Sequence, residues 1–80
     1  MKTLLLKFPR RKSKIVRVPK GTKNFVLTNL GEHSVNVWLG RILWLVLQPQ
    51  YDATNNLMPK GPLRFSPRKA GAVVSVLFHP

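Results

Sequence analysis

The residues of this 80-residue chain best suited to contact a partner are its basic side chains. The chain carries 14 Lys and Arg against two Asp and Glu, which gives a formal net charge of +12. Nine of the 14 lie in residues 1–23, before the first acid, Glu32. Such an excess of one sign is typical of proteins that meet a polyanion or an acidic protein surface. The candidate contact residues are the clustered cations of this segment: Arg10, Arg11, Lys12, Lys14 and Arg17.

Two classes of partner fit these five cations. They could neutralise phosphates of RNA or DNA and release counterions, so that binding would depend strongly on salt. They could equally dock on the acidic surface of a protein shell, where arginine forks pair with carboxylates. A basic run specifies the sign of the partner's charge and not a sequence, so both classes stay open, and a solvated face without a specific partner is the third interpretation.

Catalytic and metal-binding groups are scarce. The sequence has two histidines, His33 and His79, two carboxylates, Glu32 and Asp52, and no cysteine. Glu32 and His33 are adjacent, but no motif supplies the nucleophile, the oxyanion site and the orienting group that catalysis would need. The five glycines are isolated and do not form a phosphate-binding loop. We therefore expect no enzyme, no catalytic residue, no metal and no cofactor.

The elements that must position these residues show mainly a period of two, which is typical of strands. Six segments follow it or form short apolar runs between turn residues: 15–18, 25–28, 34–39, 42–47, 63–65 and 72–78. The sequence predicts an all-β fold, a small antiparallel β-sandwich or barrel of about six short strands. Residues 48–62, rich in proline and asparagine, predict a long loop. The expected inward side chains are Val16, Val18, Phe25, Leu27, Val35, Val37, Leu39, Leu45, Phe65, Val74, Val76 and Phe78.

Charge divides the chain into a basic N-terminal arm over residues 1–14 and a single β domain over residues 15–80. Pro9 disfavours helix before it, and the like charges of residues 10–14 repel one another, so we expect a partner to hold the arm. The longest apolar stretch, residues 35–47, is 13 residues long and includes Arg41. A spanning helix needs about 20 apolar residues, so no membrane span is expected.

Two tryptophans predict a contact surface. Alternation places Trp38 on the face opposite Val35 and Val37, where a large apolar side chain usually marks a covered surface. Residues 42–47, which include Trp44, are apolar throughout and predict a strand buried on both faces. Either residues 4–6 or another chain would cover its second face. We therefore expect Trp38 or Trp44 at an interface, with the chain a homo-oligomer within an assembly or bound to a larger subunit.

Several turn and strand patterns carry a resemblance: Val-Pro-Lys-Gly-Thr-Lys over 18–23, the segment 25–40 with its Asn-Leu-Gly turn and alternating valines, Met-Pro-Lys-Gly-Pro-Leu-Arg-Phe over 58–65, and the apolar segment 73–78. Together they resemble the small β-sandwich structural proteins of bacteriophage and other viral particles. The resemblance implies a structural virion protein, a capsid decoration, minor capsid or connector component, that docks on larger subunits. The alternative is a small basic RNA-binding protein of the ribosomal type, located on the ribosome.

Overall fold

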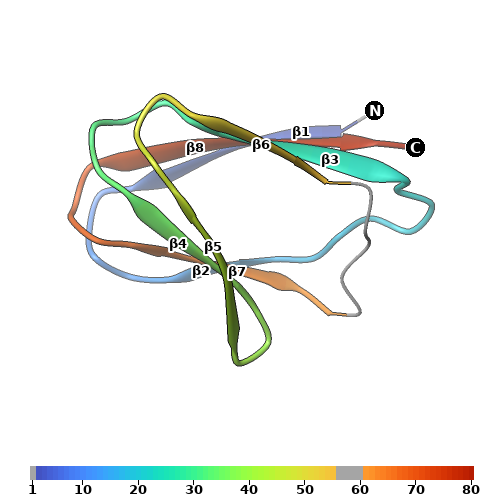
Figure 1. The fold of residues 1–80 in the computed structure, drawn as a ribbon, viewed down its shortest axis with the longest axis horizontal. Helices are drawn as coiled ribbons and strands as arrows, with labels where there is room; N and C mark the ends of the chain where they lie inside the picture. The colour runs from blue at the N-terminus through green and yellow to red at the C-terminus, as the bar shows by residue number, and fades with distance from the viewer. Residues whose placement is uncertain (1, 56–60) are drawn as a thin grey trace.

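A computed structural model describes residues 2–55 and 61–80 of the chain (Figure 1). These residues form two four-stranded antiparallel sheets that pack face to face, which confirms the predicted all-β sandwich. In the described ranges, no helix is long and apolar enough to cross a bilayer. The strands are β1 (Lys2–Phe8), β2 (Lys14–Val16), β3 (Asn24–Asn29), β4 (Val35–Leu39), β5 (Ile42–Leu47), β6 (Asp52–Asn55), β7 (Leu63–Pro67) and β8 (Ala72–His79).

The strand order is that of a jelly roll. One sheet has the order β1-β8-β3-β6 and the other β2-β7-β4-β5. Strand β1 pairs with β8, β2 with β7, β3 with β6 and β4 with β5, as in one long hairpin. The additional pairs β3–β8 and β4–β7 show that this hairpin is rolled up into two sheets. Eight strands rolled in this way form the double-sheet jelly roll.

The core lies between the inner faces of the two sheets. Alternate residues of each long strand are buried, as the period of two requires. Nine of the twelve side chains predicted to point inward are buried, and Val18, Leu39 and Leu45 pack partly buried against them. Phe8, Leu47, Leu63 and Ala72 complete the buried apolar set. The six predicted strands correspond to β2, β3, β4, β5, β7 and β8.

The separate basic arm over residues 1–14 is not confirmed. Residues 2–8 form β1, which pairs with β8 along its full length, from Lys2 opposite Phe78 to Phe8 opposite Ala72. The inward side chains of β1 are apolar: Leu4 and Leu6 pack against the core, and Phe8 is 1% exposed. Lysines lie near both ends of β1, but the apolar period of two decides its structure.

Strand β5 is not buried on both faces. It is the edge strand of its sheet, and Ile42 and Leu43 are 71% and 44% exposed. Residues 4–6 do not cover it, because they belong to the other sheet. A shift in register between Val37 and Trp38 leaves Trp44 as an extra residue in β5, so that Trp44 and Leu45 both pack against the core.

The predicted loop over residues 48–62 contains a strand. Strand β6 pairs with β3, and Leu27 lies opposite Ala53. A tight turn precedes it, in which Gln50 adopts a positive φ of 65°. Residues 56–60 of the predicted loop, and with them part of the 58–65 motif, lie outside the described residues.

Asn29, at the end of β3, joins three segments through a buried side chain. Its Nδ2 donates to the carbonyl oxygens of His33 at 2.8 Å and Leu47 at 2.9 Å. Its Oδ1 accepts a hydrogen bond from the amide of Gly31 at 2.9 Å. These bonds hold the end of β3, the start of the β3–β4 connection and the end of β5 together, and they link the two sheets.

Candidate functional site

The β1–β2 and β7–β8 connections lie side by side at one end of the sandwich (Figure 1). They are joined twice: the Gly71 amide donates to the Phe8 carbonyl oxygen at 2.7 Å, and the hydroxyls of Ser13 and Ser66 are hydrogen-bonded at 2.8 Å. Gly71 has a φ of +93°, which glycine adopts without strain. Among the described residues, seven exposed basic ones lie in or beside these connections: Lys7, Arg10, Arg11, Lys12, Lys14, Arg68 and Lys69. We call this surface the basic end, and it holds half of the chain's 14 Lys and Arg.

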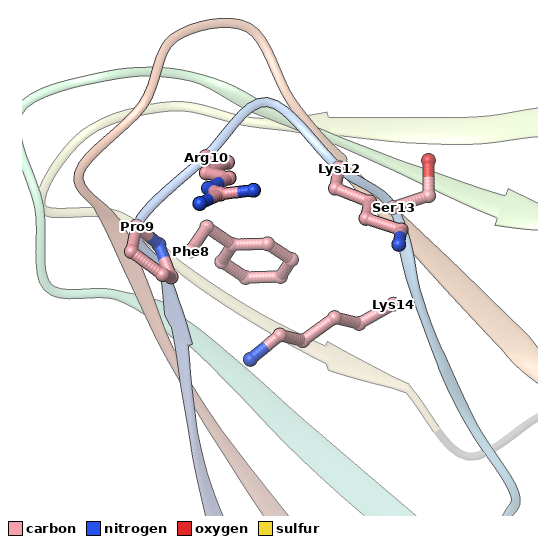
Figure 2. A pocket seen from close by; sticks show the side chains of 6 residues that line it. All are labelled: Phe8, Pro9, Arg10, Lys12, Ser13 and Lys14. Carbon is pink, nitrogen blue, oxygen red and sulfur yellow. The ribbon is translucent and has the colours of Figure 1, made fainter.

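A pocket of about 320 Å³ lies within the basic end, lined by residues 8–10 and 12–14, from the end of β1 through the connection to the start of β2. The Phe8 ring lies between the other lining side chains, with the head groups of Arg10 and Lys14 on opposite sides of the ring (Figure 2). The Lys14 ammonium lies 5.3 Å from the ring centroid and donates a hydrogen bond to the Lys7 carbonyl oxygen. The lining of the pocket therefore includes three cations, and these lie around a ring that is itself covered, since Phe8 is 1% exposed.

Three of the five predicted contact residues, Arg10, Arg11 and Lys12, lie in this connection, and a fourth, Lys14, is the first residue of β2. The fifth, Arg17, follows β2, three residues beyond Lys14, or about 10 Å along an extended chain. The contribution of Arg68 and Lys69 was not predicted. Arg68 and Lys69 are adjacent in the sequence, which is a visible signal. Only the pairing of β1 with β8 and of β2 with β7 shows that they lie next to the β1–β2 connection.

A row of side chains crosses the outer face of the second sheet. The register places Ile15 opposite Arg64, Arg64 opposite Trp38 and Trp38 opposite Leu43. The Arg64 guanidinium lies 4.9 Å from the Trp38 ring centroid, a cation–π distance. Ile15 is 66% exposed. In the part of the chain that the structure describes, Trp38 Nε1 and Arg64 Nε are buried without a hydrogen-bond partner. We call this the apolar row.

Among the described strands, β5 pairs with β4 alone, and the apolar row ends at its other edge, which we call the β5 edge. Leu43 belongs to both, and Ile42 lies beside it at the tip of the β4–β5 hairpin. Trp44 instead packs inward, with its ring 5.6 Å from that of Phe25. Trp38 therefore lies on the outer face, as alternation predicts, and Trp44 on the inner side. Both are partly buried within the chain, and their role at an interface stays a prediction.

The two histidines lie too far apart to share a site. His79 pairs with Asn24 at one end of β3, whereas the His33 carbonyl oxygen accepts a hydrogen bond from Asn29 at the other end. Five residues of extended chain separate these ends by about 17 Å. Within residues 2–55 and 61–80, no group of three or more His, Asp or Glu side chains could hold a metal ion.

Comparison of the chain with models of known protein families, with curated proteins and with solved structures found no match. The resemblance to β-sandwich proteins of viral particles therefore stays a prediction that rests on the sequence patterns. The features of the molecule that bear on its function are the geometry of the basic end, the apolar row and the β5 edge.

Proposed function

We propose that the chain is a structural component of a virus particle, in which it docks on a larger protein subunit through the β5 edge. The observation that carries this proposal is the exposed apolar edge strand of an eight-stranded jelly roll. Double-sheet jelly rolls form viral capsid subunits as well as lectin and cupin domains. The fold supports a role in a particle but does not by itself select it, so the surface of the fold decides the proposal.

The β5 edge lacks the usual protection of an edge strand. Natural edges are blunted by charged residues, proline or a cover, because unpaired backbone groups template the pairing of another chain. The six residues Ile42–Leu47 contain no charge and no proline, and Ile42 and Leu43 are exposed. A strand of a neighbouring subunit added here would bury these side chains and pair the free backbone groups. The β5 edge is therefore suited to a protein partner.

The apolar row extends the same contact across the sheet. Its exposed side chains, Ile15 and Leu43, and the partly buried Trp38 would be covered by the same partner. Trp and Arg are enriched among the residues that dominate binding energy at protein interfaces. This supports a docking surface that runs from the β5 edge over Trp38.

The basic end favours a second candidate, the small basic RNA-binding protein of the ribosomal type. Seven cations at one end of a β-sandwich are ordinary for such a protein. An RNA-binding role would use the basic end and leave the apolar β5 edge without a purpose. The virion component accounts for the β5 edge, and for this reason we prefer it.

The test is where the chain is found and in what number. Particles and ribosomes from the source of the sequence are separated on a density gradient, and the chain is quantified in each fraction by mass spectrometry against a labelled standard. The proposal expects the chain to sediment with particles at many copies per particle. A chain that sediments with ribosomes at about one copy for each would overturn the proposal in favour of the second candidate.

A further inference from the structure

We propose that the basic end binds the phosphate backbone of a nucleic acid without reading its sequence. This inference does not rest on the proposed function, because the observations that carry it lie on another part of the molecule. The basic end adjoins β1 and β2, whereas the β5 edge lies at the far side of the sheet β2-β7-β4-β5. Three strand spacings, about 14 Å, separate β2 from β5.

The backbone under the cations is fixed before any ligand binds. The bond between Gly71 and Phe8 and the bond between Ser13 and Ser66 tie the two connections together at both of their ends. Lys14 is held over the Phe8 ring. A surface whose backbone is already ordered loses less conformational entropy on binding than a free arm would. The basic end thus presents its charges in a preset arrangement.

The composition of the basic end fits phosphate better than an acidic protein. Four of its seven cations are lysines, and lysine is depleted at protein–protein interfaces. Such interfaces depend on buried aromatic or aliphatic anchors surrounded by a polar rim. The aromatic residue here, Phe8, is 1% exposed and cannot serve as an anchor. Lysine and arginine together on an exposed surface are the usual contacts of a nucleic acid backbone.

The pocket around Phe8 gives the phosphate a defined place. Arg10 and Lys14 approach it from opposite sides, and Lys12 lines it as well (Figure 2). A phosphate group in this hollow would receive charge-assisted hydrogen bonds from more than one direction. Because Phe8 is covered, no base can stack on it, and the contacts would be limited to the backbone. Binding is therefore expected to depend on charge and salt and to be insensitive to sequence.

The experiment measures binding of the full chain to a labelled oligothymidylate of about 20 nucleotides by fluorescence anisotropy, at salt concentrations from about 50 to 200 mM. The variant Arg10→Gln/Arg11→Gln/Lys12→Gln/Lys69→Gln removes four cations from the basic end and leaves Lys14, which packs on Phe8. Each lost contact to a single strand makes the negative slope of log K against log salt shallower by about 0.7, so the slope should become shallower by about 3. An oligonucleotide of mixed sequence should bind as tightly as oligothymidylate.

The matched control is Lys2→Gln/Lys20→Gln/Lys23→Gln/Arg41→Gln, which removes the same charge outside the basic end. It should change the slope much less than the basic-end variant. If the two variants lose affinity and slope equally, binding follows net charge and the proposal is wrong. If polyglutamate of equal charge competes as well as unlabelled oligonucleotide, the basic end is a site for acidic protein. If circular dichroism shows that the fourfold variant is unfolded, the pairs Arg10→Gln/Arg11→Gln and Lys12→Gln/Lys69→Gln replace it, each with an expected slope change of about 1.4.

Discussion

At the scale of single residues, Asn29 makes the most demanding set of contacts. It is a fully buried polar side chain whose three hydrogen bonds satisfy two carbonyl groups and one amide. Its replacement by alanine would leave those groups without their partner, at roughly 1–3 kcal/mol for each group that water cannot reach. We predict that Asn29→Ala lowers the free energy of unfolding by at least about 2 kcal/mol, measured by urea denaturation.

Asn36→Ala is the control for this prediction. Asn36 lies on the outer face of β4, and its Oδ1 accepts a long hydrogen bond of 3.4 Å from Arg68 Nε. Because this bond is exposed, the substitution should cost no more than about 0.5 kcal/mol. Equal losses for Asn29→Ala and Asn36→Ala would mean that the bonds of Asn29 do not hold the sheets together.

At the scale of elements, the structure differs from the sequence prediction at residues 2–8, which form strand β1 and not an arm. Leu5 and Leu6 are neighbours in β1, but Leu6 packs against the core and Leu5 is 56% exposed. We predict that Leu6→Ala lowers the free energy of unfolding by about 2 kcal/mol or more, and that Leu5→Ala changes it by about 0.5 kcal/mol or less. Chemical denaturation followed by circular dichroism measures both. Were both substitutions neutral, residues 2–8 would be an arm and not a strand.

Strand β5 should drive association of the isolated chain through its exposed edge. The double variant Ile42→Lys/Leu43→Lys places charge on that edge, which blocks the pairing of another strand. We predict that the unmodified chain self-associates as its concentration rises and that this variant stays monomeric, as measured by size-exclusion chromatography with light scattering. The control Leu5→Lys/Leu30→Lys adds the same charge at two other exposed leucines. If the control abolishes association as completely, added charge and not the β5 edge explains the effect.

The local part of the fold could be predicted from the sequence. Alternation of Val35, Val37 and Leu39 defines β4 and its inward face without any knowledge of its neighbours. The same signal is present in β1, at Leu4, Leu6 and Phe8, but the cations of the N-terminal segment favoured an arm. Strand β6 carries no such signal, because Asp52–Asn55 is short and mostly polar.

What the sequence could not provide is the order of the strands. An apolar run such as Ile42–Leu47 fits a central strand as well as an exposed edge strand. The structure shows that it is an edge strand, because among the described strands it pairs with β4 alone. The basic end likewise depends on the order of the strands. Its two connections are more than 50 residues apart in the sequence, and the closing of β8 on β1 brings the connection that carries Arg68 and Lys69 beside the one that carries Arg10 and Lys12.

At the scale of the whole molecule, the jelly roll separates two kinds of surface. The basic end occupies the connections beside β1 and β2, and the apolar edge belongs to β5 at the other side of the same sheet. A net charge of +12 opposes the approach of two copies, and a bound polyanion would reduce that repulsion. One surface could then contact nucleic acid while the other contacts protein, an arrangement suited to a component that lies between a shell and its contents.

The most direct test of the proposed function is a cross-link from the β5 edge inside assembled particles. The chain has no cysteine, so Leu43→Cys introduces a unique attachment site for a thiol-specific photo-crosslinker, and Leu30→Cys provides an exposed control on the β3–β4 connection. Particles that contain either variant are irradiated, and the cross-linked species are identified by mass spectrometry. The proposal predicts that position 43 cross-links to a larger particle subunit with much higher yield than position 30. Equal yields from the two positions, or cross-links from position 43 to ribosomal components, would contradict it.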